Sequence, residues 1–245
     1  MPFKTSSRIT FLITWKKVIT SKVNFFLLAG FLLFLFSIWI RDSYELSFTF
    51  FLYLFPHLFL LLSQGMVRDE VESGSLENAM FLEGRFKKYL VEKNAAVLIL
   101  GSAVSLIVFT FFAVYGLSTH VFSALYFYKF LIGTLVGIYY VFLGVLLGYS
   151  FKGGSNVLIL VLAQVMIFFG FSFTASNSPA FLDYIDKGSF PDLISKIKFM
   201  GLVVIFPNFV ISEKFFIYSL EVGALCVLLF LLQKMRIRNV ELIRE

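Results

Sequence analysis

The chain has 245 residues, a net charge of +6, 34 phenylalanines and an apolar share of 59%, with a mean hydropathy of +0.90. This composition is more apolar than that of a soluble globular domain and excludes an ordinary water-soluble fold. The single cysteine, Cys226, excludes a disulfide framework or a cysteine-based metal site within one chain.

The first 22 residues predict an amphipathic helix that lies in the membrane interface. Phe11, Trp15 and Ile19 recur at helical spacing, whereas Lys16 and Lys17 fall mostly elsewhere around the helix. The alternative is a basic leader without regular structure. The apolar stretch that follows is longer than the core of an ordinary signal peptide and ends in Trp-Ile-Arg-Asp, so we expect no cleavage.

Six long apolar stretches each predict a membrane-spanning helix. A spanning helix needs about 20 mostly apolar residues, because a rise of about 1.5 Å per residue must cross about 30 Å of hydrocarbon. Barrel strands would instead appear as short alternating segments. The predicted spans are 23–40, 46–66, 94–116, 125–149, 157–174 and 215–232. The sequence therefore predicts one all-α integral membrane domain over 1–245.

The distribution of Lys and Arg predicts how these spans are oriented. With both termini in the cytoplasm, 15 of the 21 basic residues fall in cytoplasmic segments and six on the opposite side. This is the asymmetry that the positive-inside rule describes. Basic residues beside anionic lipid headgroups also explain the net charge without nucleic acid as a partner. We therefore expect a multi-pass protein of the cell inner membrane with both termini cytoplasmic.

The longest predicted cytoplasmic segment, 67–93, contains the signals of a short surface helix over about 76–82. Gly74 breaks the chain, Ser75 can cap the helix, and Glu77 lies near the positive end of its dipole. One face of this helix is apolar and holds Leu76, Ala79 and Met80. Such a ridge fits either lipid headgroups or a groove on another protein.

Small residues at helical spacing mark the fourth predicted span. These are Gly133, Gly137, Gly144 and Gly148. Small residues four apart allow two helices to approach closely, so the pattern predicts a helix-packing face. That face could meet a helix of the same chain or a second copy.

The segment 175–214 is predicted to lie at the outer face of the membrane. Its apolar part, 200–211, is too short to span and is interrupted by Pro207 and Asn208, so it predicts a re-entrant or surface helix. A seventh full span here would place the termini on opposite sides and spoil the charge asymmetry.

Four polar side chains inside the predicted spans are candidates for a substrate path: His57, Gln64, Gln164 and Glu221. A charge at mid-bilayer costs at least about 2.5 to 3.5 kcal/mol on insertion scales, so Glu221 should face protein or water, or be protonated. Each also has a structural interpretation. Glu221 could reach water or make one interhelical hydrogen bond, the two glutamines could join helices, and His57 could satisfy a carbonyl freed by Pro56.

The sequence contains no recognisable catalytic machinery. It lacks the Gly-x-x-x-x-Gly-Lys-Ser/Thr pattern of a phosphate-binding loop, and its two histidines form no paired metal-binding motif. We therefore expect a protein that is not an enzyme and has no resident cofactor or metal.

The segment from Arg68 to Lys93 carries a family resemblance. It holds an acidic pair, a Gly-Ser-Leu-Glu turn, a basic stretch and a lysine entering the third span, which are Asp69-Glu70, Gly74-Ser75-Leu76-Glu77, Arg85 to Lys88, and Lys93. This pattern resembles the permease subunits of type 2 ABC exporters, the ABC-2 family. The leader, the six spans and the irregular outer segment extend the resemblance over nearly the full chain. The chain departs from the pattern at Glu83, where Pro is usual, and at Glu92, where Gly is usual.

The resemblance implies the permease subunit of an ATP-driven exporter, which moves substrate between two membrane subunits. The short helix would be the coupling helix, which docks on a separate ATP-binding subunit. ATP and Mg²⁺ are expected to bind in that subunit. The implied docking residues are Asp69, Glu70, Gly74, Ser75, Leu76, Glu77, Ala79 and Met80. A second permease subunit, identical or homologous, and the lipid bilayer complete the expected partners.

Two other functions stay open at this point. One is an ion-coupled secondary transporter or channel in which Glu221 or His57 handles protons or ions. The other is a membrane scaffold or immunity-type protein that binds a partner without transport. The first predicts activity without ATP, and the second tolerates changes at Glu221 while still requiring the loops.

Overall fold

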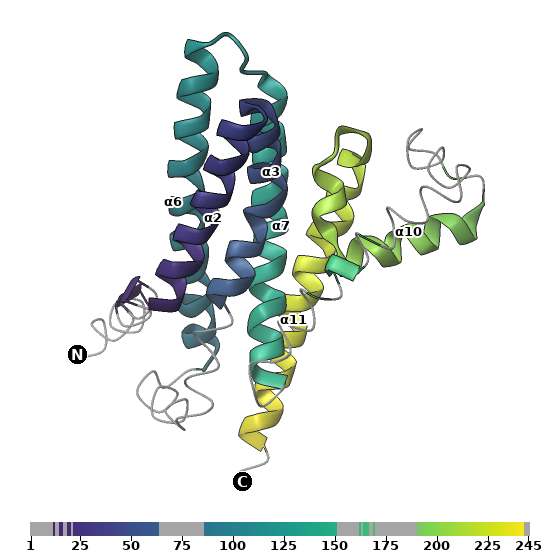
Figure 1. Ribbon diagram of the computed structural model, residues 1–245. Coiled ribbons are helices and arrows are strands. Elements are labelled where there is room, and N and C mark those ends of the chain that lie inside the picture. Colours follow the sequence, from purple (N-terminus) through teal and green to yellow (C-terminus); the bar gives the residue numbers. More distant parts are fainter. Residues whose placement is uncertain are drawn as a thin grey trace.

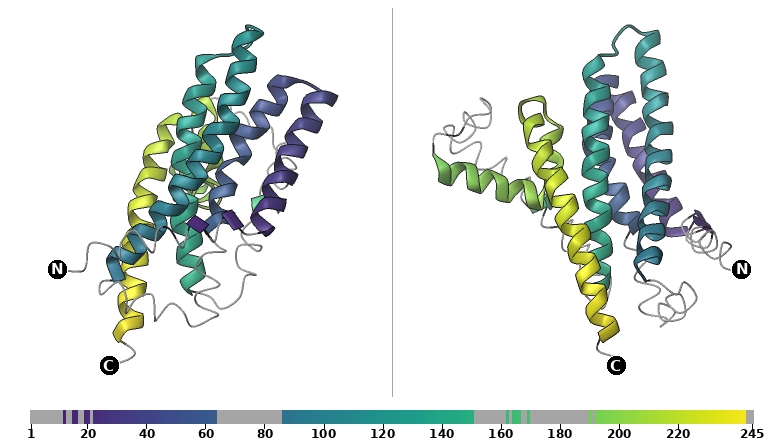
Figure 2. Two further views of the ribbon diagram at one scale, coloured as in Figure 1. Left: turned by 90° about the vertical axis from the view of Figure 1, so that its left-hand side faces the viewer. Right: turned by 180° about the vertical axis from the view of Figure 1, so that it is seen from behind.

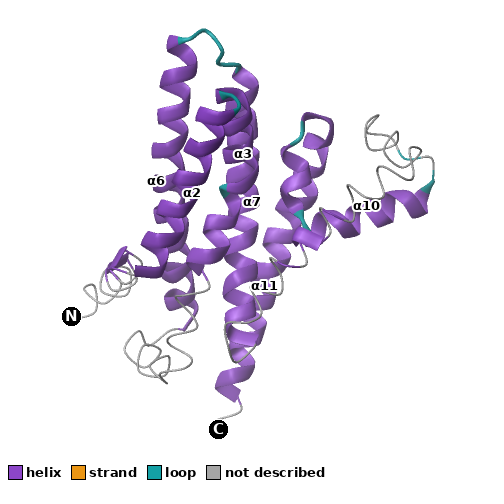
Figure 3. Ribbon diagram, in the orientation of Figure 1, coloured by secondary structure: helices purple, strands orange, loops and turns teal. Residues whose placement is uncertain are grey.

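The computed structural model describes residues 22–63, 86–150 and 192–242, with isolated positions between 12 and 20, between 162 and 169, and at 190. Helices connected by short loops account for these residues, and no strand occurs among them (Figure 3). This confirms the predicted all-α class.

Five of the described helices run along one another in an elongated bundle (Figure 1). They are α2 (Lys22–Arg41), α3 (Tyr44–Leu54), α6 (Phe86–Ser118), α7 (Ala124–Ser150) and α11 (Ser219–Leu242). After a break at Phe55, helix resumes directly beyond α3 over 56–63. Residues 119–123 connect α6 to α7 at one end of the bundle, here called the loop end. Helix α2 begins and α11 ends at the opposite end (Figure 1).

Among the described residues, four helical stretches are long and apolar enough to cross a membrane. They are Tyr44–Ser63, Leu90–Ser118, Ala124–Gly148 and Phe215–Met235, and they overlap the predicted spans 46–66, 94–116, 125–149 and 215–232. Helix α2 covers the predicted span 23–40. Its apolar part, Leu28–Arg41, is shorter than the four stretches above. The predicted span 157–174 is helical at the positions described there, and its other residues lie outside the described part of the chain.

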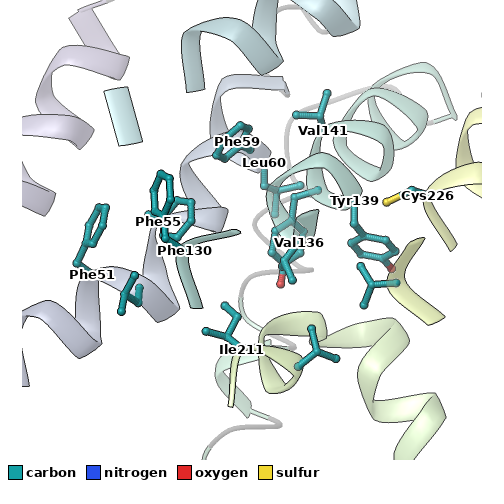
Figure 4. Packing of buried hydrophobic residues seen from close by; sticks show 14 of the residues in the cluster. Phe51, Phe55, Phe59, Leu60, Phe130, Val136, Tyr139, Val141, Ile211 and Cys226 are labelled. Carbon is teal, nitrogen blue, oxygen red and sulfur yellow. The ribbon is translucent and has the colours of Figure 1, made fainter. Parts of the chain in front are cut away.

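Aromatic rings fill the core between α3 and α7. Phe51, Phe55 and Phe59 recur every four residues on one face of the broken helix, and all three are completely buried (Figure 4). Phe55 stacks on Phe130 of α7, with ring centroids 5.2 Å apart. Such pairs add about 0.5 to 1.5 kcal/mol each beyond the burial of their area. The broken helix is therefore held firmly against α7.

The glycines of α7 supply the surface on which these rings rest. A Cβ atom at Gly133 would lie 2.6 Å from the Phe55 ring, and one at Gly137 would lie 2.7 Å from the Phe59 ring. Real Cβ atoms do not approach this closely, so larger residues there would push the helices apart. The predicted packing face exists, and its partner is a helix of the same chain.

Helix α10 (Leu193–Ile205) and two 3-10 helices, η1 (Pro207–Ile211) and η2 (Glu213–Tyr218), precede α11. Helix α10 begins earlier than the predicted 200–211, because Asp192 caps it by accepting a hydrogen bond from the Ser195 N–H at 3.0 Å. Pro207 follows its end. Helix α10 runs across the axis of α7 in both the front and the rear views (Figures 1 and 2).

The predicted leader helix is described at only a few positions. Residues 12, 15, 16, 19 and 20 are helical. Trp15 is partly buried and packs against the main core, whereas Leu12 and Ile19 are exposed. The placement of the leader in the membrane interface stays a prediction.

Candidate polar site at the helix break

The second span is interrupted where Pro56 lacks an N–H group. Leu58 donates to the Phe55 carbonyl at 3.0 Å, a step of three residues instead of four. The Tyr53 carbonyl accepts a hydrogen bond from the side-chain amide of Asn208, which stands in η1 and is 155 residues away in sequence. The interpretation that His57 satisfies a carbonyl freed by Pro56 stays a prediction, and the backbone group beside its ring is that of Leu54.

A chain of buried hydrogen bonds leads away from Asn208. The Tyr140 hydroxyl of α7 donates to Asn208 Oδ1 at 2.6 Å, and Gln164 Nε2 donates to that hydroxyl at 2.9 Å and to the Ile205 carbonyl at 3.0 Å. Gln164 Oε1 lies 2.8 Å from His57 Nε2. Tyr140 and Asn208 are completely buried, and Gln164 is 2% exposed. We call His57, Gln164, Tyr140 and Asn208 the polar cluster.

Two backbone carbonyls fix the direction of every bond in the polar cluster. Because the Ile205 and Tyr53 carbonyls can only accept, each must face the NH₂ group of its amide, Gln164 or Asn208. The opposite amide orientations would set an oxygen against each carbonyl. Gln164 therefore presents its oxygen to His57, whose Nε2 must carry the proton and donate.

The other ring nitrogen of His57 is left open. Nδ1 is buried and has no hydrogen-bond partner among the described residues. The backbone carbonyl of Leu54 is the nearest acceptor to the ring apart from Gln164.

Of the four predicted path residues, the structure brings His57 and Gln164 together. Glu221 lies apart from them in the first turn of α11, where its Oε2 is buried without a hydrogen bond from the described residues. Gln64 lies outside the described residues. Sequence reasoning missed Tyr140, because a tyrosine in an apolar run resembles a lipid-facing residue. For Asn208 the signal was present, since an amide interrupts the apolar stretch 200–211.

A second buried polar contact joins three helices toward the end of the bundle opposite the loop end. Asn94 of α6 donates to Gln233 Oε1 of α11 at 3.1 Å, and Gln233 Nε2 donates to the Phe142 carbonyl of α7 at 2.6 Å. Lys93, beside Asn94, is completely buried. Polar side chains therefore fix the start of α6 against the other helices.

The predicted docking residues, from Asp69 to Met80, lie outside the described residues, so their docking role stays a prediction. Among the residues that are described, no group of three or more His, Cys, Asp or Glu side chains could hold a metal ion. Comparison with protein-family models, curated proteins and solved structures finds no match to this chain.

Proposed function

We propose that this chain is the membrane-spanning permease subunit of an ATP-driven ABC exporter and works with a separate ATP-binding subunit. The observation that carries the proposal is the sequence pattern from Arg68 to Lys93, with its acidic pair, Gly-Ser-Leu-Glu turn and basic stretch. The four helices able to cross a membrane and the absence of a phosphate-binding loop in the sequence agree with a transport subunit driven by another chain.

Helix α6 starts at Phe86, directly after the proposed docking segment, so it is the element to which a movement of that segment would first pass. Toward the middle of α6, a Cβ atom at Gly101 would lie 2.7 Å from the Phe59 ring, and the same ring packs against Gly137 of α7. A shift of α6 would thus press on the broken helix and on α7 together. ATP can drive such a shift only by binding one arrangement of the partner subunits more tightly than the other.

The polar cluster is the proposed contact for polar groups of the cargo. Its internal bonds are satisfied, and only His57 Nδ1 is open. A carboxylate would meet an unprotonated acceptor there and be repelled, whereas a hydroxyl or an N–H group could donate to it. The proposed cargo therefore carries a hydrogen-bond donor group.

Purification of a tagged full-length chain in mild detergent tests the partnership. We expect a stoichiometric ATP-binding subunit and ATPase activity, both lost when Leu76 and Met80 are changed to Asp. At 100° per residue, Asn78 and Leu82 lie on the opposite side of the predicted helix. The matched control, Asn78→Asp with Leu82→Asp, should keep the partner. A chain that purifies alone, under conditions that preserve other such complexes, would favour the ion-coupled or scaffold alternatives.

A charge reversal separates docking from folding. In proteoliposomes that contain both subunits, Glu77→Lys should leave the complex folded but uncouple ATP hydrolysis from export, because its charge would repel a basic partner surface. Glu241→Lys, the same change near the end of α11, should have no such effect. Coupled export that persists in Glu77→Lys would refute the docking role, and export without ATP would indicate ion coupling.

A further inference from the structure

The ring of His57 lies beside two oxygen atoms that can only accept hydrogen bonds. Gln164 Oε1 stands 2.8 Å from Nε2. Its orientation is fixed because the NH₂ group of the same amide serves the Ile205 carbonyl and the Tyr140 hydroxyl. The second oxygen is the backbone carbonyl of Leu54. A neutral imidazole has one N–H group and can serve only one of these oxygens, whereas an imidazolium has two.

The helix break explains why the Leu54 carbonyl can take a donor from a side chain. In an unbroken helix the Leu58 N–H would donate to Leu54, four residues earlier. Here Leu58 donates to the Phe55 carbonyl at 3.0 Å instead, because Pro56 interrupts the helix. Since Nε2 of His57 already serves Gln164, Nδ1 is the nitrogen that could serve Leu54, and it can do so only when it carries a proton.

The aromatic surroundings of His57 also suit a cation. The Tyr140 ring lies 5.1 Å and the Phe206 ring 6.0 Å from the His57 ring, measured between centroids. A cation within about 6 Å of an aromatic centroid is attracted to that ring. Tyr140 is the titratable group that faces His57, and its hydroxyl donates to Asn208. No acidic or basic side chain of the described residues acts on the ring, so the acceptors and the aromatic rings would hold the charge.

We propose that His57 is a proton-binding site, whose imidazolium donates from Nε2 to Gln164 and from Nδ1 to Leu54. The bound proton ties the carbonyl at the helix break to the helical residue Gln164, and it thereby braces the second span. This inference rests on the contacts of His57 and needs no ATP-binding subunit. One consequence rests on the proposed function: a protonated Nδ1 cannot accept a hydrogen bond, so a proton and the donor group of the cargo exclude each other at this nitrogen.

Proton binding can be measured by ¹⁵N NMR of the full-length His120→Asn protein in bicelles, in which His57 is the remaining histidine. Between about pH 8 and about pH 4, a range that spans the ordinary titration of histidine, the Nδ1 signal should change from that of an unprotonated nitrogen to that of a protonated one. Nε2 should stay protonated throughout. An Nδ1 that takes up no proton while the protein is folded would overturn the proposal.

Closing the helix break tests the Leu54 acceptor. Pro56→Ala restores an N–H group at residue 56 and lets Leu58 donate to Leu54, which takes this carbonyl away from His57. At about pH 5 the ratio of doubly to singly protonated His57 should fall about tenfold, the effect of one hydrogen bond to a charged group.

Removal of the other acceptor gives a second variant on a different element. Gln164→Leu deletes the oxygen that faces Nε2 and should also lower the ratio about tenfold. Gln233→Leu is the matched control, because Gln233 is likewise buried but bonds to Asn94 and to the Phe142 carbonyl instead of His57. This control should leave the ratio unchanged.

Each outcome separates this inference from the proposed function. If the ratio falls in neither Pro56→Ala nor Gln164→Leu, or falls equally in Gln233→Leu, the two acceptors do not hold the proton and the site is overturned, while the ATPase partnership stays intact. A ratio that falls only in the two test variants would support the site. If such a protein recruits no ATPase, the proton site stands and only its consequence for the cargo is lost.

Discussion

The hydrogen bonds of the polar cluster can be tested by removing a single oxygen. Tyr140→Phe keeps the ring of this completely buried residue and removes only the hydroxyl, which donates to Asn208 at 2.6 Å and accepts from Gln164 at 2.9 Å. The change opens no large cavity, so its effect reports mainly on these two bonds. Asn208 Oδ1 would lose its donor, whereas the Gln164 amide would keep the Ile205 carbonyl.

The expected loss of stability follows from those two bonds. Interhelical hydrogen bonds in membrane proteins average about 0.6 kcal/mol each, which gives about 1.2 kcal/mol for two. A buried acceptor left without a donor can raise the cost to about 3 kcal/mol. Tyr139→Phe is the control, because its hydroxyl makes one described bond, to the Val204 carbonyl, and should cost about 0.6 kcal/mol.

Reversible unfolding of the full-length protein in bicelles measures both variants. Tyr140→Phe should lower the free energy of unfolding by about 1 to 3 kcal/mol and by more than Tyr139→Phe does. If Tyr140→Phe is as stable as the unaltered protein, or costs no more than Tyr139→Phe, the hydroxyl does not join the two amides and the assigned bond directions lose their basis.

Two further predictions concern helix packing and the histidine tautomer. Gly137→Ala should destabilise the protein by about 1 to 3 kcal/mol in the same unfolding assay, because its Cβ would lie 2.7 Å from the Phe59 ring. Gly30→Ala, with nothing within 4 Å, should instead stabilise it by about 0.5 to 1 kcal/mol, and equal effects would contradict the described packing. In ¹⁵N NMR of His120→Asn, the remaining His57 should carry a proton on Nε2. A proton on Nδ1 alone would refute the assigned orientation of the amides.

The helical class and the location of the long helices could be predicted because they depend on local composition. A run of apolar residues must form a helix in lipid whatever lies beside it, so Ala124–Gly148 follows the predicted 125–149 closely. The start of α10 could not be found this way. Lys196 and Lys198 lower the apolarity of its first half, and the cap at Asp192 is a single residue.

Partners across the fold were harder to predict than the elements. The spacing of Gly133 and Gly137 indicated a close contact, but only the fold shows that Phe55 and Phe59 occupy it. The four polar path candidates were chosen because each side chain interrupts an apolar run. That criterion finds His57 and Gln164 but does not show that they pair. It overlooks Tyr140, because a tyrosine counts as apolar and does not interrupt an apolar run.

The bond between Asn208 and the Tyr53 carbonyl constrains the order of events during synthesis. The second span enters the membrane long before residue 208 leaves the ribosome, since 155 residues separate the two groups. Until then the carbonyl lacks its final donor in a medium without water to replace it. The nascent span therefore lacks this bond until η1 has been synthesised, and chains that stop before η1 never form it.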